Sequence, residues 1–593
     1  MQEFRRWEES NDASEWTLKY YKGLGTSSSR EAREVFKELA EHSIALQEDE
    51  RARETLAMFY DDGKTSERKR LLTTGYDDTA AVDYSQRECS ITSFMMEEHL
   101  HFSFYSVFRA LPSAVDGLTP SRRKALFFFL SSPRAGEVKV AQAASGVAQK
   151  TLYLHGENSL VETIVGLAQD YVGTNNIALL QPLGQFGSRN DKPSTHAAAR
   201  YIFTRLDPAA QALFPAADFP VLEYRREESQ QVEPTHYVPV LPLLLVNGAQ
   251  GIGTGFSTCV PSHCVRALCA CVRAHLDGED LPDIPAHFQG FTGPVWQTDR
   301  AVLTSGVVQR TGARTWLISE LPVGRWTEPF LSDLKAFAEG TRSCKGLTIL
   351  TVTNMSSEFR VKIEVGLGED CEDVTPEQFS QALKLQTSLS TTHMYAFDGS
   401  YTLRLFSSAK DIFLEHAAVR LALYWKRRSH QLEEMRARQE MLQGKIAFIA
   451  LVVSGELPLR GVPRAELVGL LREKGLPALA AKGEAQGYDY LLNLSVGAFT
   501  QERISALKEE AEALRVAQEE LEGQDASALW RVDLQAFEEA YADYEARLSK
   551  RHADEGANVA SSSGKRAAPA ARKRGGAASA STNAAARKRG KRL

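Results

Sequence analysis

The sequence predicts a multidomain protein of mixed α/β class, and three observations lead to that prediction. A chain of 593 residues has room for about three to five domains. Between residues 290 and 405, β-branched and polar residues alternate, as in TWLI at 315–318, LTIL at 347–350 and RVKI at 360–363. Such alternation is typical of strands in an antiparallel sheet. Further on, apolar residues recur with the spacing of two long helices.

Residues 137–172 predict two helices joined by a turn. The first runs from about 138 to 149 and places Val140, Ala144 and Val147 on one face. After the turn, Ser159 and Glu162 have the spacing of a capping box, which predicts that the second helix opens there. A helix-turn-helix is one common way to enter a DNA groove. Many helical proteins contain such a pair, so the signal is weak by itself.

Two stretches near the C-terminus carry heptad spacing. The first comprises Leu432, Met435, Gln439, Leu442, Ile446, Ile449 and Val453, and the second comprises Ile504, Leu507, Ala511, Leu514, Gln518 and Leu521. These spacings predict an antiparallel coiled coil, and the residues between them, roughly 455–500, hold enough apolar side chains for a small globule at its tip. A stalk that carries a globule is suited to dimerisation. Two ordinary amphipathic helices of a bundle are the alternative.

The composition, 43% hydrophobic and 25% charged, is typical of globular proteins. No run of about 18 apolar residues occurs, so no membrane span is expected. The N-terminal residues lack the apolar core of a secretory signal. The cysteines have no paired CxxC spacing, so we expect reduced thiols in an intracellular protein and no zinc site. They are Cys89, Cys259, Cys264, Cys269, Cys271, Cys344 and Cys371.

The net charge of −6 is unevenly distributed. Residues 556–593 contain ten Lys or Arg and no Asp or Glu, so this segment carries +10 and residues 1–555 carry −16. Because the body is acidic, a DNA site must be a local basic groove. The Ala/Gly/Ser-rich tail predicts disorder, and its basic clusters suit nuclear import or nonspecific phosphate contact. A solvated tail without a specific role is the alternative.

Five short segments are too unusual to result from periodicity alone. They are KYYKGLGT at 19–26, VDGL at 115–118, QFG at 185–187, ARYIFT at 199–204 and NGAQGIGTG at 247–255. In this order and at these spacings the series resembles the eukaryotic-type DNA topoisomerase II family, a type IIA topoisomerase, over about residues 1–545. ISELP at 318–322 and KLQTSL at 384–389 extend the resemblance into the later part of the chain.

The resemblance implies the domain organisation of the DNA breakage-rejoining portion of that family. It implies a C-terminal remnant of a Toprim domain at 1–48, a linker at 49–95, a winged-helix DNA-cleavage domain at 96–210, a tower α/β domain at 211–405, a coiled coil with the C-gate dimerisation globule at 406–545, and a disordered basic tail at 546–593. In the family, two subunits form a homodimer on double-stranded DNA, and each cuts one strand.

Tyr201 aligns with the DNA-cleaving tyrosine of the family. A phenol has a pKa near 10, so roughly one part in a thousand is phenoxide at pH 7 and attack on a phosphodiester needs help. The neighbouring Arg200 can hold a permanent positive charge against the phosphate in the transition state. Attack would give a 5′-phosphotyrosyl bond that preserves the energy of the broken strand, so that resealing needs no ATP.

Other residues receive roles only through the resemblance. His155 is expected to support the phosphate, although a histidine satisfied at a helix start is the alternative. Side chains expected to contact DNA are Lys22, Arg122, Arg123, Lys124, Lys139 and Gln185. Any of the basic ones could instead be a solvated surface charge. Ile252 is expected to push between base pairs and bend the DNA, because Gly251 and Gly253 permit close backbone approach. A glycine-rich nucleotide loop is the alternative, but no dinucleotide-binding strand–helix unit surrounds it.

The family uses Mg²⁺ and ATP, and here the sequence departs from its pattern. No counterpart of the acidic magnesium motifs or of the ATPase segment is found, so we expect no metal-binding and no cofactor-binding residue in this chain. We therefore expect an ATP-dependent type II topoisomerase, an isomerase that relaxes and decatenates DNA, which as this fragment alone is inactive. The complete enzyme would be expected in the nucleus, with an organellar location as the alternative.

Three interpretations of the missing parts compete. The chain is a truncated piece of an ordinary enzyme, one subunit of a split topoisomerase whose ATPase and Toprim portion is a separate chain, or a non-catalytic DNA-binding dimeric scaffold. The intact Arg200–Tyr201 pair argues against the scaffold, which needs neither residue.

Overall fold

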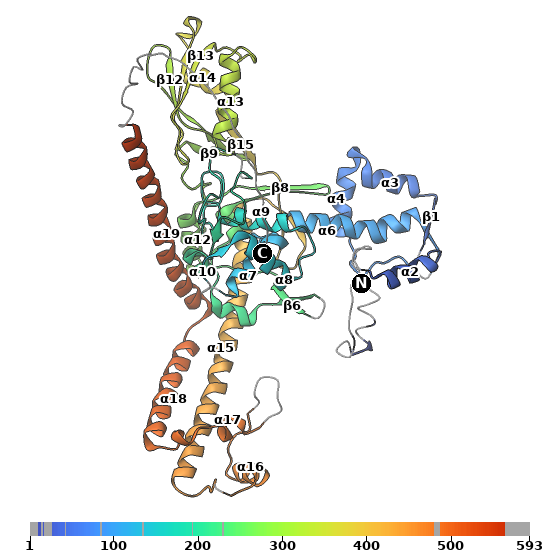
Figure 1. Ribbon diagram of the computed structural model, residues 1–593, viewed down its shortest axis with the longest axis vertical. Coiled ribbons are helices and arrows are strands. Elements are labelled where there is room, and N and C mark those ends of the chain that lie inside the picture. Colours follow the sequence, from blue (N-terminus) through green and yellow to red (C-terminus); the bar gives the residue numbers. More distant parts are fainter. Residues whose placement is uncertain are drawn as a thin grey trace, which may run out of the picture. The chain divides into compact units, whose positions relative to one another are not determined.

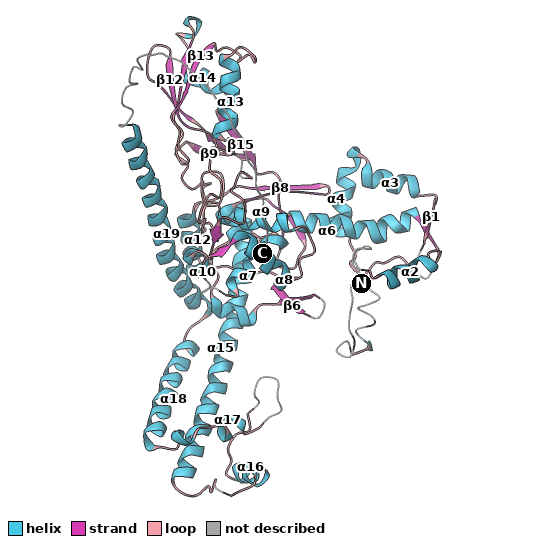
Figure 2. Cartoon of the chain, viewed as in Figure 1, coloured by secondary structure: helices cyan, strands magenta, loops and turns pink. Residues whose placement is uncertain are grey.

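The computed structural model describes residues 7, 10–12, 16, 27–41, 43–83, 86–132, 136–191, 194–227, 230–459, 461–479 and 487–563, with the backbone alone at 496 and 552–563 (Figure 1). The chain divides into a unit of residues 1–544 and a unit of residues 545–593. Among the described helices, none has both the length and the apolar character that a membrane crossing requires. The first unit contains helices and sheets in separate segments, which confirms the predicted mixed α/β class (Figure 2).

The first segment consists of short helices and two short strands. They are α2 (Ser29–Lys37), β1 (Ala45–Gln47), α3 (Ala52–Tyr60), η3 (Asp62–Lys64), α4 (Thr65–Thr74), β2 (Glu88–Ser90), α5 (Ile91–Ser93), η4 (Phe94–His99) and α6 (Leu100–Ala110). Strands β1 and β2 pair in parallel. Phe59, Leu72 and Met95 are buried in one core with Val107 of α6. The prediction of a linker at 49–95 is therefore wrong, because this stretch buries apolar side chains of its own.

The second segment holds most of the predicted site residues. Its elements are α7 (Pro120–Leu130), β3 (Val138–Lys139), α8 (Val140–Thr151), α9 (Glu157–Ala168), β4 (Phe203–Thr204), α10 (Pro208–Leu213), η5 (Ala216–Val221), β5 (Tyr224–Glu227), β6 (Gln230–Pro234), α11 (Leu243–Asn247), β7 (Ala249–Gly253), β8 (Phe256–Val260) and α12 (Val265–Asp277). Helices α8 and α9 confirm the predicted pair, and Val140, Ala144 and Val147 are fully buried on one face of α8.

The predicted capping box at the start of the second helix is wrong. Helix α9 begins two residues earlier than Ser159, with Gly156 as its N-cap and no capping side chain. The hydroxyl of Ser159 instead accepts a hydrogen bond from Tyr153 (3.2 Å), and Glu162 pairs with His196 (3.1 Å). The sequence spacing was right for a cap, but tertiary partners occupy both side chains.

The third segment confirms the predicted antiparallel sheet. Its elements are β9 (Val295–Gln297), β10 (Ala301–Ser305), β11 (Val307–Arg310), β12 (Thr315–Glu320), α13 (Thr327–Ala338), β13 (Ile349–Asn354), β14 (Ile363–Leu367), η6 (Glu369–Cys371), α14 (Pro376–Ala382), β15 (Gln386–Ser390), β16 (Met394–Phe397) and β17 (Leu403–Phe406). One sheet has the order β11-β12-β14-β13 and another the order β15-β10-β9, all antiparallel. Trp316, Phe330 and Phe379 anchor the core between the larger sheet and its helices.

The fourth segment confirms the predicted antiparallel helix pair. Its elements are α15 (Ala409–Val453), α16 (Arg464–Glu473), α17 (Asp489–Leu492), η7 (Val496–Ala498), α18 (Gln501–Glu522) and α19 (Ala526–Ser563). Leu442 and Ile449 of α15 share a core with Ile504 and Leu507 of α18. The short helices between them, at the end of the pair, enclose a separate apolar core around Leu471 and Leu491 (Figure 1). Helix α19 passes the predicted boundary of the tail at residue 546, and residues 564–593 lie outside the described residues.

A buried charge network fixes the base of α15. The guanidinium of Arg420 is fully buried and donates to the carboxylate of Asp218 and to the carbonyl oxygen of Val238 (2.7 Å). Arg427 donates to Asp533 of α19 (2.6 Å), which also accepts from the Tyr424 hydroxyl (2.9 Å). The two guanidiniums and two carboxylates balance in charge, so the network holds α15 and α19 together without an uncompensated buried ion.

Candidate nucleic-acid interface

The Tyr201 side chain stands on an exposed loop whose backbone is firmly held. The first two backbone N–H groups of α8 donate to the carbonyl oxygens of Ile202 (3.0 Å) and Ala199 (3.2 Å). Phe203 exchanges two backbone hydrogen bonds with Leu183 (3.1 and 2.9 Å), and Ile202 is buried. The side chain of Tyr201 is nevertheless 67% exposed. A rigid backbone thus presents a free phenol to solvent, as a nucleophile for a large substrate requires.

Arg200 is the immediate neighbour of that phenol in space as well as in sequence. Its guanidinium carbon lies 4.8 Å from the centre of the Tyr201 ring. Among the described residues, none forms a hydrogen bond with the Tyr201 hydroxyl or an ion pair with Arg200. Both groups are therefore available to a substrate, and the positive charge suits an anion at the phenol.

Lys139 and Gln185 share this surface. Lys139 precedes α8 and pairs with Phe203 in the β3–β4 ladder, and its ammonium lies 5.8 Å from the centre of the Phe203 ring. The backbone oxygen of Gln185 accepts from the amide of Ala197 (3.0 Å), which ties its loop to the one that carries Tyr201. Both side chains are exposed. The structure thus brings together four of the residues predicted for the site.

Arg123 and Lys124, predicted as DNA contacts, are instead internal. Arg123 is 2% exposed and donates to both carboxylate oxygens of Asp116 (2.7 and 3.0 Å). This ion pair raises the pKa of the Arg123 guanidinium above its usual value. The Lys124 ammonium donates to the carbonyl oxygen of Thr151 (2.8 Å) and to Glu233 (3.0 Å). Neither cation can reach a phosphate, because its donors are used inside the protein.

The remaining predicted contacts fall into three situations. Arg122 on α7 is half-buried, and desolvation lowers the pKa of its guanidinium. His155 is half-buried just before α9, and its Nε2 is 3.0 Å from the hydroxyl of Tyr105 on α6. The described ring contacts of His155 are with Tyr105 and Tyr153 and do not include Tyr201. Lys22 lies outside the described residues.

Ile252 projects from a hairpin whose glycines lie on α6. Strands β7 and β8 pair in antiparallel register, with Ile252 opposite Ser257, and the Ile252 side chain is 86% exposed. A Cβ atom at Gly251 would overlap the carbonyl oxygen of Ala110, and one at Gly253 would lie 2.9 Å from the Cα of Val107. The predicted close backbone approach is confirmed, and the surface approached is α6. The apolar tip therefore points away from a backbone that is seated on a helix.

We expect Gly251→Ala to lower the free energy of unfolding by about 1–3 kcal/mol, because the hairpin must move off α6 to admit a methyl group. Gly166→Ala on α9 is the matched control, since no atom lies within 4 Å of the added Cβ. That control should change stability by less than about 1 kcal/mol, in the stabilising direction. Urea unfolding of both variants measures the difference, and equal midpoints would contradict the close packing.

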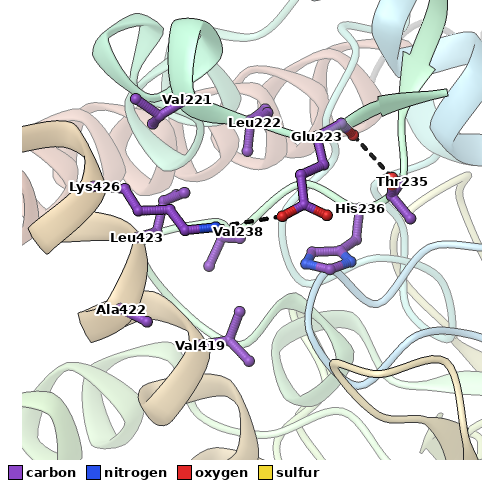
Figure 3. A pocket seen from close by; sticks show the side chains of 10 residues that line it. All are labelled: Val221, Leu222, Glu223, Thr235, His236, Val238, Val419, Ala422, Leu423 and Lys426. Carbon is purple, nitrogen blue, oxygen red and sulfur yellow. Dashed lines mark hydrogen bonds and ion pairs between the residues drawn. The ribbon is translucent and has the colours of Figure 1, made fainter. Parts of the chain in front are cut away.

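A small cavity lies between α15 and the segment from η5 to β6, away from these residues (Figure 3). Its volume is about 90 Å³, well below the roughly 300–1,000 Å³ of typical ligand pockets. Lys426 donates to the Glu223 carboxylate at its edge (3.3 Å), and Nδ1 of His236 is buried there without a described partner. No predicted site residue lines this cavity. The candidate site is accordingly a surface, which suits a polymer more than a small molecule.

The donor set around Tyr201 suits a phosphate and does not suit a metal ion. Arg200 and Lys139 are cations, and carboxylates of the adjoining segments are engaged elsewhere, Glu137 with Arg205 (3.7 Å) and Glu162 with His196 (3.1 Å). Over the described part of the chain, no group of three or more His, Cys, Asp or Glu side chains could hold a metal ion. A magnesium ion thus has no fitting site among these residues, and no step is assigned to one.

Sequence reasoning missed the partners that decide these roles. Asp116 lies within the VDGL segment but was not paired with Arg123, although a buried arginine requires a carboxylate. Tyr105, the hydroxyl partner of His155, lies 50 residues earlier in the chain. The spacing of seven between Asp116 and Arg123 could have indicated the first pair. No local signal indicates the second.

Comparison with known proteins agrees with this surface. The family model for the A-type chain of DNA gyrase/topoisomerase IV matches residues 109–535, and the one for the C-terminal associated domain of TOPRIM matches residues 1–107. The chain is 32% identical to DNA topoisomerase 2, mitochondrial, of Dictyostelium discoideum, over 95% of the chain and 44% of that protein. It is 33% identical to DNA topoisomerase 2-alpha of Gallus gallus, over 94% of the chain and 38% of that protein. The chain therefore spans less than half the length of these relatives.

A solved structure shares the fold. The crystal structure of the Plasmodium falciparum topoisomerase II DNA-binding, cleavage and re-ligation domain superimposes with a TM-score of 0.83 at 29% identity, covering 93% of this chain and 78% of that one. Together with the gyrase/topoisomerase IV family model, which matches most of the chain, this similarity extends from the short helices at the start to the helix pair near the end. The chain therefore belongs to the type IIA DNA topoisomerases, the family that includes DNA gyrase, topoisomerase IV and eukaryotic DNA topoisomerase 2.

Proposed function

We propose that this chain supplies the DNA-breaking and DNA-rejoining surface of a type II topoisomerase, with Tyr201 as the nucleophile and Arg200 beside it. The observation that carries the proposal is a phenol that is 67% exposed on a rigid loop, with a guanidinium 4.8 Å from its ring centre. A structural tyrosine would bury its ring or its hydroxyl, and this one does neither.

The reaction is a transesterification. The Tyr201 oxygen attacks the phosphorus, the bond from phosphorus to the 3′ oxygen breaks, and that oxygen takes a proton while the phenol loses one. One phosphodiester is exchanged for another, so no co-reactant is needed and the reverse attack by the 3′ hydroxyl reseals the strand. Arg200 stabilises the charge that gathers on the phosphate oxygens in the transition state.

The proposal is tested by trapping the covalent intermediate. Plasmid DNA is incubated with the chain and with the ATPase and Toprim portion of a relative as a separate polypeptide, in the presence of Mg²⁺ and ATP. Denaturant is then added, and DNA linked to protein is recovered. We expect linear DNA with protein attached to its 5′ ends. Failure to recover any adduct would reject the proposal and favour a non-catalytic scaffold.

Lys139 is proposed to contact the DNA backbone next to the cleaved phosphate. We expect Lys139→Ala to reduce the slope of log affinity against log salt by about 1, with little change in sequence preference. Lys150→Ala, at the other end of α8, is the matched control and should leave the slope unchanged. Fluorescence anisotropy of a labelled duplex at several salt concentrations measures both. An unchanged slope for Lys139→Ala would remove this residue from the interface.

Ile252 is proposed to enter the DNA between base pairs and bend it. An apolar side chain that is 86% exposed is unfavourable in water, and unstacked bases offer it an apolar contact. Ile252→Ala should therefore reduce DNA bending, measured as energy transfer between dyes at the two ends of a duplex. Unchanged energy transfer would contradict the role.

We further propose that two copies assemble through the globule at the end of the α15–α18 pair, so that each Tyr201 cuts one strand of a double-stranded DNA. The complete enzyme would then couple ATP to strand passage, and the basic residues of the tail would direct it to the nucleus. Light scattering of the purified chain checks the assembly against the chain mass of 65.6 kDa. A monomer at all concentrations would contradict it.

A further inference from the structure

The hairpin that carries Ile252 is supported on two sides, and only one of them is α6. At its turn, Gly255 approaches the Cβ of Arg68 on α4 to 3.9 Å, and the hairpin lies beside that helix (Figure 1). The Thr254 hydroxyl pairs with that of Ser106 on α6 (3.1 Å). The hairpin is thus placed between two helices, and the side facing α4 lacks the glycine contacts that seat it on α6.

Lys69 makes the contact on the α4 side. Its ammonium lies 5.6 Å from the ring centre of Phe256, the first residue of β8, and 5.3 Å from the ring centre of Tyr395 on β16. The two rings pack edge to face with centres 5.1 Å apart. Among the described residues, no carboxylate pairs with Lys69. One cation therefore joins α4, the base of the hairpin and a strand from the third segment.

Helix α4 is itself anchored, so the contact can transmit force. The Arg68 guanidinium donates to the carbonyl oxygens of Met58 (2.8 Å) and Asp61 (2.6 Å), which fixes α4 to α3. Leu72 is buried in the same core as Phe256. Helices α3 and α4 belong to the segment matched by the C-terminal associated domain of TOPRIM, while the hairpin belongs to the segment matched by the gyrase/topoisomerase IV family model.

We propose that Lys69 is a positioning residue for the Ile252 wedge, through which the α3–α4 unit sets the angle of the hairpin against DNA. The inference rests on the proposed function in that Ile252 bends the DNA. A two-stranded ribbon is marginally stable by itself, and a wedge that separates stacked bases must withstand a reaction force. Lys69 braces the hairpin on the face where the glycine contacts are absent.

The test compares Lys69→Met, Lys69→Arg and Ile252→Ala in the full chain, with energy transfer across a duplex of about 30 base pairs labelled at both ends. Methionine keeps the length of the side chain and removes its charge, and arginine keeps the charge. We expect Lys69→Met to reduce the bent fraction by roughly threefold to tenfold, the ordinary effect of a lost cation–π contact, and Lys69→Arg to restore it. Thermal unfolding of each variant shows that it is folded.

Three results would overturn the inference. If Lys69→Met bends DNA like the wild type while Ile252→Ala does not, the wedge role stands and the brace is wrong. If Lys69→Arg fails together with Lys69→Met, the site requires the lysine for packing and not for its charge. If Lys69→Met lowers the salt slope of binding by about 1, Lys69 binds a phosphate directly. Unchanged bending in Ile252→Ala would instead reject the wedge role, and the brace with it.

Discussion

Replacing Tyr201 by phenylalanine is expected to abolish the covalent adduct while leaving DNA affinity unchanged. The variant keeps the ring beside Arg200 and lacks only the hydroxyl that attacks the phosphorus. Removal of a catalytic nucleophile costs roughly 10⁴-fold or more in other enzymes, so the adduct should fall to background. The loop should remain in place, because its hydrogen bonds to α8 are made by backbone atoms. Denaturant trapping measures the adduct and anisotropy measures the affinity.

Tyr153→Phe is the matched control. Tyr153 lies in the same segment, and its hydroxyl forms a hydrogen bond with Ser159 (3.2 Å), so its loss should affect stability modestly and leave the adduct intact. Adduct that persists in Tyr201→Phe would assign the nucleophile to another residue. Adduct lost in both variants would show that trapping responds to general disturbance of the segment.

Replacing Arg123 by methionine is expected to destabilise the protein by about 3–5 kcal/mol, because Asp116 would remain charged and unpaired in the interior. Asp116 is 0% exposed and also accepts hydrogen bonds from the backbone amides of Leu118 and Tyr237 (3.0 Å each). Those two bonds cannot replace the bidentate partner. Urea unfolding should show a lower midpoint, and any loss of DNA binding should follow the loss of folded protein.

The double variant Arg123→Met with Asp116→Leu separates the two roles that Arg123 could have. Removing both ions leaves no unpaired charge, so much of the lost stability should return. DNA binding should return with it if Arg123 is structural. A double variant that is stable but binds DNA with a salt slope reduced by about 1 would restore the phosphate contact first expected for Arg123.

Sequence patterns predicted the parts of this protein that depend on local spacing. The heptads placed α15 and α18 against each other because a spacing of three and four produces one apolar face on each helix. The glycines on either side of Ile252 predicted a close backbone approach, and the structure supplies α6 as the surface. The alternation between 290 and 405 predicted antiparallel strands because side chains in a strand point alternately to its two faces.

The roles of individual cations could not be predicted in the same way. Lys124 and its partners Glu227 and Glu233 are 103 and 109 residues apart in the chain, so no local pattern links them. Lys139, by contrast, is exposed in the structure, and its neighbours in the sequence do not announce that difference. Whether a basic residue faces DNA or the interior depends on which distant carboxylates the fold brings to it. That is a property of the tertiary structure alone.

Helix α15 has a mechanical consequence. Its 45 residues make a rod of about 68 Å without a break, whereas the returning chain is jointed between α18 and α19. The joint lies level with Arg428, which donates to the last carbonyl oxygens of α18 (3.2 and 2.7 Å), next to the buried charges of Arg420 and Arg427. The rod is thus a lever with its fulcrum at the ion network. A tilt of about 10° there would carry the far end through about 12 Å, so small rearrangements of four charged side chains would become large excursions at the tip.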